Sequence, residues 1–260
     1  MKKFGLIGHP IAHSLSPALF KAGYDGRYPY ELIETSDFEE AYSRFLAEYD
    51  GINVTAPFKE LALLKADIIS EECKVTGASN LLIKTSEGVK AYNSDYRGIR
   101  LWLLSALQGM KRNPVKQINA LIIGFGGAGK AAAAAAEAAG MHVTILNRTC
   151  KSPEIKPLEA FKEEFRKADV IIYNLPVRIP ELDQLTEEDC TPGRMKIVLE
   201  ANYRNPSFDE ELVKKLTGWN SLFIYEEGET WLLMQAMTGY ELFTGETPDA
   251  QNMMSVIKSK

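Results

Sequence analysis

The feature that most constrains the fold is a stretch over residues 119–149, in which a short apolar run, a glycine-rich turn, an alanine-rich run and a second apolar run follow one another. Residues 120–123 have the composition of a buried parallel strand, residues 130–139 that of a helix, and residues 142–146 that of the next strand. Between the first strand and the helix stand three glycines at G-x-G-x-x-G spacing: Gly124, Gly126 and Gly129. In this context the turn predicts a Rossmann-type unit that binds the pyrophosphate of a dinucleotide at the helix N-terminus. A glycine-rich turn in an ordinary α/β layer is the alternative.

The end of the second predicted strand indicates which dinucleotide. NAD-binding units usually have an acidic residue there, about 20 residues after the first glycine, for the ribose 2′-hydroxyl. Here Asn147 and Arg148 follow the strand and Lys151 stands nearby. A guanidinium pairs with phosphate in a bidentate manner, so these residues favour NADP. A solvated strand end is the alternative.

Composition excludes several other classes of protein. The chain has 260 residues, of which 45% are hydrophobic and 25% charged, and a net charge of −5. These values predict a soluble globular protein of one large or two modest domains that does not bind nucleic acid. The apolar run at residues 4–7 is too short for a signal peptide, and no run has the length of a membrane span. The three cysteines are scattered without metal-ligand spacing, so we expect a cytoplasmic protein without a metal.

Strands and helices alternate through the first hundred residues, which predicts a separate N-terminal α/β domain. The polar, turn-rich segment 109–115 marks the expected entrance to the nucleotide domain, and Gly228 its end. A long apolar helix predicted over residues 229–243 has no strand partner there, so we expect it to return to the first domain. The predicted domains are therefore 1–108 with 229–260, and 109–228.

Polar residues follow or precede several predicted N-terminal strands, where ligands of open α/β sheets bind. They are Ser14, Ser16, Thr55, Lys59, Asn80 and Asp95. Lys59 is notable because a cation in the first turn of a helix opposes the helix dipole, and such local violations are expected at functional sites. Structural alternatives remain open: Lys59 could point into solvent, and Ser16 and Asp95 could cap the helices that follow them.

Several motifs together resemble the shikimate dehydrogenase family. In chain order they are Pro10-Ile11-Ala12-His13-Ser14-Leu15-Ser16-Pro17, Asn53-Val54-Thr55-Ala56-Pro57-Phe58-Lys59, Gly77-Ala78-Ser79-Asn80, Asn93-Ser94-Asp95, Gly124-Phe125-Gly126-Gly127-Ala128, Asn147-Arg148-Thr149, Tyr203-Arg204-Asn205-Pro206, and Gly228 through Gln235. The resemblance spans essentially the whole chain. Some positions depart from the usual pattern: Ser94 replaces threonine, and Glu200 replaces aspartate.

The resemblance implies NADPH-dependent reduction of 3-dehydroshikimate to shikimate, a step of aromatic amino-acid biosynthesis. It implies Lys59 and Asp95 as the catalytic pair. The implied substrate contacts are Ser14, Ser16, Thr55, Asn80, Tyr203 and Gln235. The implied cofactor contacts are Gly124, Phe125, Gly126, Gly127, Ala128, Asn147, Arg148, Thr149, Ala201 and Gly228. The expected protein acts on a small molecule, as a monomer or a homodimer.

Three alternatives remain at this point. One is a quinate or quinate/shikimate dehydrogenase of the same superfamily, which would use NAD or NADP. Another is a non-catalytic module that senses a nucleotide, although the Lys59 and Asp95 pair argues against it. The third is a different Rossmann enzyme such as a methyltransferase, whose methyl donor would have no 2′-phosphate for Arg148 to bind.

Overall fold

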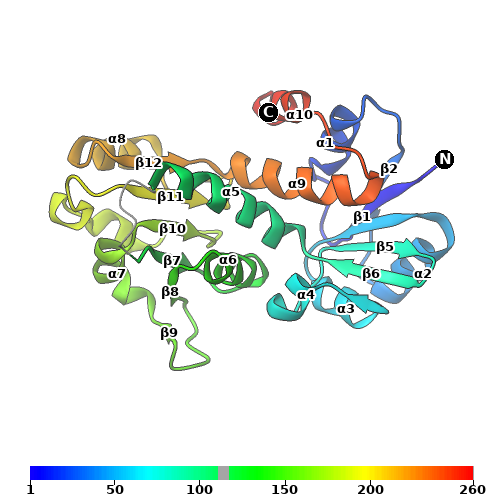
Figure 1. The fold of residues 1–260 in the computed structure, drawn as a ribbon, viewed down its shortest axis with the longest axis horizontal. Helices are drawn as coiled ribbons and strands as arrows, with labels where there is room; N and C mark the ends of the chain where they lie inside the picture. The colour runs from blue at the N-terminus through cyan, green and yellow to red at the C-terminus, as the bar shows by residue number, and fades with distance from the viewer. Residues whose placement is uncertain (111–116, 260) are drawn as a thin grey trace. The chain divides into compact units, whose positions relative to one another are not determined.

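The structure is a computed structural model that describes residues 1–110 and 117–259 (Figure 1). Its residue contacts divide the chain into two compact units: the first unit is Met1–Gly98 with Leu233–Lys260, and the second is Ile99–Leu232. The expected fold class is confirmed, including the return of the C-terminal helix to the first unit. The division falls ten residues before the N-terminal border drawn from the sequence and a few residues after the C-terminal one. Most of the expected boundary segment 109–115 lies outside the described residues.

The described strands of the first unit form a mixed sheet in the order β2-β1-β3-β5-β6-β4. The strands are β1 (Phe4–Gly8), β2 (Tyr30–Glu34), β3 (Gly51–Val54), β4 (Ile68–Ile69), β5 (Leu81–Thr85) and β6 (Gly88–Tyr92). The pair β5 and β6 is the hairpin that Ser86 and Glu87 predict, and β5 also runs antiparallel to β3. The central strands β1 and β3 are parallel and fully buried, as their apolar composition requires.

Helices cover the first sheet and carry its polar residues. They are α1 (Ser16–Gly23), α2 (Phe38–Glu48), α3 (Lys59–Leu64), α4 (Glu71–Thr76) and α10 (Ala250–Lys258). Apolar residues of α2 lie on one face, where Phe38, Ala41 and Phe45 are buried in the core with Ile52 and Val54 of the sheet. The α10 helix, which the sequence did not predict, packs against α1 (Figure 1). Two long helices, α5 (Ser94–Met110) and α9 (Gly228–Thr244), contain the two borders between the units.

The second unit has a parallel sheet in the order β12-β11-β10-β7-β8-β9. Its strands are β7 (Asn119–Ile123), β8 (His142–Leu146), β9 (Ile155–Lys156), β10 (Val170–Tyr173), β11 (Lys196–Glu200) and β12 (Phe223–Glu226). If the strands are numbered from 1 to 6 within the unit, the order is 6-5-4-1-2-3. This is the strand order 3-2-1-4-5-6 of a dinucleotide-binding sheet, written from the opposite edge. The order reverses between β7 and β10, so the switch point lies at the carboxyl end of β7.

Three helices lie wholly within the described part of this unit, and the first begins three residues earlier than the predicted start at residue 130. They are α6 (Gly127–Ala138), α7 (Phe161–Lys167) and α8 (Glu210–Trp219), with 3₁₀ turns at Leu158–Ala160, Pro180–Gln184 and Glu187–Cys190. The α8 helix begins at Glu210 because the Asp209 carboxylate accepts a hydrogen bond from the Leu212 N–H and caps it. The α6 helix contacts β7 and β8.

A lysine is fully buried in the second unit. Lys196 begins β11, and its Nζ donates hydrogen bonds to the carbonyls of Phe165 and Ala168 at the end of α7. The last carbonyls of a helix lack the usual i+4 donor. The Phe165 carbonyl also accepts from the Ala168 N–H (3.3 Å), and the ammonium gives both carbonyls a charged donor. Burial lowers the pKa of Lys196 to about 8.

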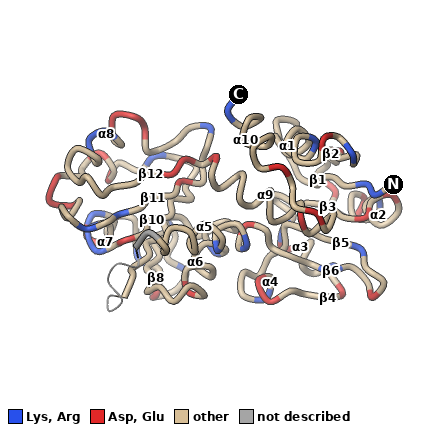
Figure 2. Tube along the Cα trace, turned by 45° about the horizontal axis from the view of Figure 1, so that its top comes forward, with Lys and Arg blue, Asp and Glu red and all other residues tan. Residues whose placement is uncertain are grey.

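Charge is spread along both units. Figure 2 shows acidic and basic residues interspersed on the tube, without an extended stretch of one sign among the residues drawn in colour. Over the described residues, no helix is long and apolar enough to cross a membrane. Within residues 1–110 and 117–259, no group of three or more His, Cys, Asp or Glu side chains is placed to hold a metal ion.

Candidate active site

The strand pairing of the first unit gathers the predicted polar residues at one edge of its sheet. The parallel strands β1 and β3 end side by side, and β5 begins beside the end of β3 because the two are antiparallel. The end of β6 lies beside the start of β5 for the same reason. Asn80 connects them, since its carbonyl accepts from the Val54 N–H (2.8 Å) and its N–H donates to the Tyr92 carbonyl (3.2 Å).

Lys59 and Asp95 form an ion pair at this edge. Lys59 is the first residue of α3 and Asp95 the second residue of α5, and their Nζ and Oδ2 atoms are 2.6 Å apart. The side chains are only 23% and 11% exposed, so the alternative that Lys59 simply points into solvent is wrong. A cation at a helix N-terminus is held here by a carboxylate, which offsets the unfavourable helix dipole.

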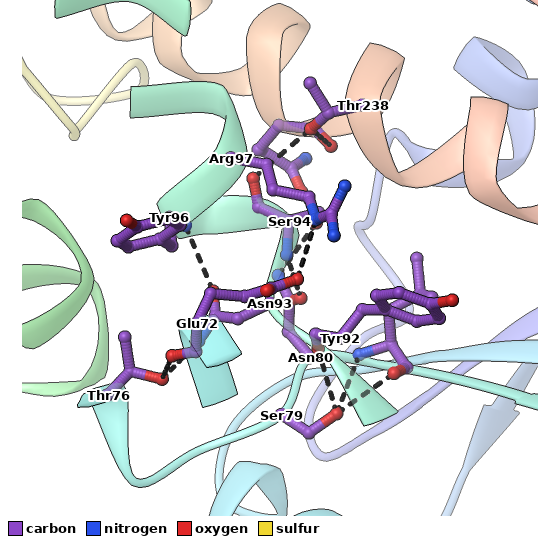
Figure 3. Close-up of polar contacts among 12 residues, drawn as sticks. Glu72, Thr76, Ser79, Asn80, Tyr92, Asn93, Ser94, Tyr96, Arg97 and Thr238 are labelled. Atoms are coloured by element: carbon purple, nitrogen blue, oxygen red, sulfur yellow. Dashed lines mark hydrogen bonds and ion pairs between the residues drawn. The ribbon is translucent and has the colours of Figure 1, made fainter. Parts of the chain in front are cut away.

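Asp95 does not cap its helix, which corrects one of the structural alternatives. The α5 helix begins at Ser94, and the Tyr96 N–H donates to the Asn93 Oδ1 (3.1 Å; Figure 3). The Asn93 amide nitrogen in turn donates to Thr76 Oγ1 and to the Ala78 carbonyl, both at 3.1 Å. Because Asn93 takes the capping role, the Asp95 carboxylate pairs with Lys59 instead.

Ser14 and Ser16 lie in and just after the loop that follows β1. Their hydroxyl oxygens are 3.1 Å apart, and the Ser16 N–H donates to Ser14 Oγ (3.2 Å). The expectation that Ser16 caps α1 is wrong, because Ser16 is the first helical residue and its own N–H is bound by the Ser14 side chain. The Tyr240 hydroxyl of α9 donates to the Ser16 carbonyl (3.1 Å), which ties this loop to the C-terminal segment.

Thr55 directly follows the neighbouring strand β3 and lies against the end of β1. Its N–H donates to the Ile7 carbonyl (2.9 Å). A side chain at Gly8 would lie 2.3 Å from the Thr55 methyl, so glycine at this position leaves room for Thr55. The structure therefore places Thr55 at the same edge as Lys59 and Asn80.

A hydrogen-bonded network joins Asn80 to Gln235 through Ser94. Asn80 and Ser94 are labelled in Figure 3. The Asn80 amide nitrogen donates to Ser94 Oγ (3.0 Å), and the Ser94 N–H donates to Asn80 Oδ1 (2.7 Å). The Ser94 hydroxyl donates to Gln235 Oε1 (3.3 Å). Ser94 and Asn93 were not among the predicted site residues. The sequence signal for them was the motif Asn93-Ser94-Asp95, in which they directly precede Asp95.

In the second unit the glycine-rich turn has the geometry that a dinucleotide requires. Gly124 has a φ of +88°, which disfavours any residue with a side chain. A Cβ at Gly129 would lie 1.9 Å from the Gly124 carbonyl oxygen, so the helix packs directly on the strand end. A Cβ at Gly126 would meet no atom within 4 Å, which leaves space for the approach of a ligand. The α6 helix begins at Gly127 rather than at residue 130, so the N–H groups of Gly127 and Ala128 lie in its first turn, where the backbone can bind an anion.

Asn147 joins the turn to the loop after β8. Its Oδ1 accepts a hydrogen bond from the Phe125 N–H (3.2 Å), and its amide nitrogen donates to the Thr149 carbonyl (3.0 Å). Arg148 and Thr149 are exposed at this strand end. The Asn147 side chain therefore links the glycine-rich turn to the loop after β8, which contains the expected phosphate-binding residues.

Ala201, Tyr203 and Gly228 meet at the carboxyl ends of β11 and β12. The Ala201 N–H donates to the Tyr173 carbonyl (2.8 Å), and a Cβ at Gly228 would lie 2.5 Å from the Tyr203 nitrogen. The loop between them is anchored by Glu200, which is fully buried. Its carboxylate accepts from the N–H groups of Ser207 and Phe208 and from the Tyr225 hydroxyl. Tyr203 belongs to the second unit, whereas the other predicted substrate contacts belong to the first.

A parallel sheet with a dinucleotide turn, together with a unit that carries a lysine–aspartate pair, fits a nicotinamide-dependent oxidoreductase, and comparison with known proteins supports this class. Residues 6–82 match the family model described as the shikimate dehydrogenase substrate binding domain. Residues 79–189 match the model of the D-isomer specific 2-hydroxyacid dehydrogenase NAD binding domain.

The chain is also similar to curated proteins and solved structures of one family. Over 243 residues the chain is 31% identical to shikimate dehydrogenase (NADP(+)) of Caldanaerobacter subterraneus subsp. tengcongensis, covering 90% of this chain and 82% of that protein. It is 29% identical to the Bacillus subtilis enzyme of the same name, covering 100% and 98%. The crystal structure of shikimate 5-dehydrogenase from Thermus thermophilus in complex with NADP(H) and shikimate has a TM-score of 0.77 and 27% identity, covering 100% and 99%. The chain belongs to the shikimate dehydrogenase family.

Proposed function

We propose that the chain catalyses the reversible, NADPH-dependent reduction of 3-dehydroshikimate to shikimate in aromatic amino-acid biosynthesis. The observation that carries the proposal is the ion pair of Lys59 and Asp95, 2.6 Å apart at the sheet edge where the serine loop and Asn80 also lie. The relatives that span the chain are named for this activity and for NADP(+).

The proposed roles of the catalytic pair follow from the charge that develops in the reaction. The nicotinamide supplies a hydride to the carbonyl carbon when it is bound, and negative charge then develops on the carbonyl oxygen. Lys59 stabilises that charge and donates a proton from its Nζ to the oxygen, so that the product is an alcohol. Asp95 holds the ammonium in place and accepts a hydrogen bond from a ring hydroxyl of the substrate. In the reverse direction Lys59 accepts the proton.

The other predicted residues would bind the substrate. The paired hydroxyls of Ser14 and Ser16 are suited to a carboxylate, which accepts hydrogen bonds with both oxygens. Thr55, Asn80 and Gln235 offer hydroxyl and carboxamide groups to the ring hydroxyls of shikimate, and Tyr203 is a further proposed contact through its phenol. These assignments rest on the family motifs and on the position of the residues at the strand ends.

The residues of the second unit fit NADP. The open space at Gly126 and the N-terminus of α6 suit a pyrophosphate, with Gly124, Phe125, Gly127 and Ala128 forming the turn. Asn147, Arg148 and Thr149 would hold the adenosine ribose and its 2′-phosphate, with Arg148 supplying the charge. Ala201 and Gly228 would present backbone to the nicotinamide.

Steady-state kinetics with two substrates and two cofactors test the proposal. We expect the highest kcat/KM with shikimate and NADP among the four combinations of shikimate or quinate with NADP or NAD. A higher value for quinate with NAD would assign the chain to the quinate dehydrogenases instead. No oxidation of either substrate, with NADPH binding retained, would favour a non-catalytic nucleotide-binding module.

The proposed enzyme acts in the cytoplasm on a small molecule and has no nucleic-acid or membrane partner. We propose that it is a monomer or a homodimer. Light scattering of the purified chain at assay concentration distinguishes these two states, and a larger mass would contradict both.

A further inference from the structure

Ser94 occupies a central position between two of the proposed substrate contacts. It is fully buried at the first residue of α5, between Asn80 at the start of β5 and Gln235 on α9. Figure 3 shows Ser94 between Asn80 and Thr238, with dashed lines from its backbone and side chain. A buried hydroxyl without charge has little value as an acid or base, so its hydrogen bonds are the property to explain.

The hydrogen bonds of Ser94 fix which way each carboxamide is turned. Asn80 is bound at both ends, since its nitrogen donates to Ser94 Oγ and its oxygen accepts from the Ser94 N–H. A carboxamide held by one donor and one acceptor cannot flip without losing both bonds. With its lone pair accepting from Asn80, the Ser94 hydroxyl directs its single proton to Gln235 Oε1, which turns the nitrogen end of Gln235 away from Ser94.

Close packing keeps α9 near enough for this contact. A Cβ at Gly239 would lie 3.1 Å from Ser94 Cβ and 3.2 Å from Ser94 Oγ, so glycine at 239 allows the two helices to approach at Ser94. The Thr238 hydroxyl also donates to the Ser94 carbonyl at 3.4 Å. Thr238 therefore touches the Ser94 backbone, and its hydroxyl bonds to neither carboxamide side chain.

We propose that Ser94 is a positioning residue for substrate recognition, whose hydroxyl couples the carboxamides of Asn80 and Gln235 so that both present a fixed pattern of donors and acceptors to the substrate hydroxyls. The inference rests on the proposed function, because Asn80 and Gln235 are substrate contacts only in that function. Ser94 itself does not touch the substrate. Its effect is on substrate affinity rather than on hydride transfer or cofactor binding.

The first test compares Ser94→Ala with the wild-type protein. We expect the KM for shikimate to rise about tenfold, because two hydrogen bonds that orient the carboxamides are removed, while kcat falls less than about threefold. The KM for NADP should not change. Thr238→Val is the matched control, since it removes a hydroxyl that contacts Ser94 but orients neither carboxamide, and its KM for shikimate should equal that of the wild type. An unchanged KM in Ser94→Ala would overturn the proposal.

A double-mutant cycle distinguishes positioning from a general structural role. In the Gln235→Ala background the Ser94 hydroxyl has no carboxamide on α9 to orient, so the effect of Ser94→Ala on KM should shrink at least about threefold. Equal effects in both backgrounds would contradict the coupling. If the alanine variant loses its fold by circular dichroism, Ser94→Cys replaces it, with KM expected to rise at least about threefold because a thiol is a weak donor and acceptor. A wild-type KM in that variant would equally overturn the proposal.

The activity of the wild-type protein distinguishes the proposed function from the role of Ser94. If wild-type protein does not oxidise shikimate, the proposed function is wrong. If wild-type protein is active and the Ser94 variants have its KM, only the role of Ser94 is wrong.

Discussion

The two units present their functional residues in different ways. In the first unit the site consists of side chains that hold one another, as in the Lys59 and Asp95 pair and the Asn80, Ser94 and Gln235 network. In the second unit the site consists largely of backbone. In the glycine-rich turn, Gly124 has a positive φ, Gly129 packs against the Gly124 carbonyl, and Gly126 leaves open space. In the mixed sheet of the first unit, β1, β3 and β6 end and β5 begins at one edge. In the parallel sheet of the second unit, the site lies at the carboxyl ends of the strands and the N-terminus of α6.

This difference determines how each site should respond to mutation. A side-chain site loses function in proportion to the group that is removed, and the fold survives. A backbone site is sensitive to added atoms, because the addition of one methyl group can either block a ligand or disrupt the fold.

The largest effect should come from Lys59→Ala. We expect kcat for shikimate oxidation to fall about 10³-fold, since the charge and the proton acceptor are both lost, while the thermal unfolding temperature changes little. Steady-state assays and a thermal melt measure the two quantities. Lys65→Ala is the control, because Lys65 is a neighbouring lysine whose ammonium pairs with Glu39 at the surface (2.7 Å), and it should retain wild-type kcat. An unchanged rate in Lys59→Ala would remove Lys59 from the mechanism.

Two glycines of one turn should respond in opposite ways to the same methyl group. Gly129→Ala places a Cβ against the Gly124 carbonyl, so we expect the free energy of unfolding to fall by about 3 kcal/mol. Gly126→Ala meets open space at a φ of −80°, so unfolding should change by less than about 0.5 kcal/mol. In Gly126→Ala the Kd for NADPH should instead rise about tenfold, because the methyl group occupies the approach to the pyrophosphate.

Urea denaturation and fluorescence titration with NADPH measure these changes. If Gly126→Ala bound NADPH as the wild type does, the pyrophosphate would not lie at the turn. If Gly129→Ala were as stable as the wild type, the close packing of α6 on the end of β7 would be wrong.

The choice of cofactor should depend on one side chain. We expect Arg148→Ala to raise the KM for NADPH by about 10- to 100-fold, equivalent to about 1.4–2.7 kcal/mol, and to leave the KM for NADH unchanged. Lys214→Ala, which removes an exposed cation of α8, controls for the change in net charge. A parallel rise for both cofactors would mean that Arg148 shapes the loop rather than binds the 2′-phosphate.

The smallest effect concerns stability and pH in the second unit. The pKa of buried Lys196 is lowered to about 8 in the folded chain, so between pH 8 and its ordinary value near 10.5 the unfolded chain binds more protons. Stability contributed by this group therefore rises with pH, by about 1 kcal/mol between pH 8 and pH 9. Urea denaturation of wild type and Lys196→Met at both values isolates the effect, which the variant should lack. Parallel pH profiles would show that Lys196 keeps its ordinary pKa.

The sequence predicts most of the second unit because its signals are local. Apolar runs of strand length, a glycine spacing and an alanine-rich helix lie within about thirty residues, and each depends on neighbours along the chain. The helix starts were less predictable, because several adjacent residues can compete to cap one helix. Ser16 and Asp95 are good caps in isolation, but Ser14 and Asn93 reach the relevant N–H groups in the folded chain.

The site of the first unit could not be derived from local pattern alone. Lys59 and Asp95 lie 36 positions apart, and their contact depends on β5 running antiparallel to both of its neighbours. The family resemblance implies that these two residues act together, and the pairing of the strands explains why they are in contact. Ser94 was missed because serine at the start of a helix has an ordinary structural explanation, and its link to Gln235 spans 141 positions.

The division of the chain has a consequence for its synthesis on the ribosome. The first unit begins with Met1–Gly98 but needs Leu233–Lys260, which carries Gln235, the Tyr240 contact to the serine loop and α10 against α1. The second unit is one continuous segment and can be completed first. At typical elongation rates the N-terminal segment waits on the order of ten seconds for its C-terminal partner. The half of the enzyme that is translated first is therefore the last to be finished.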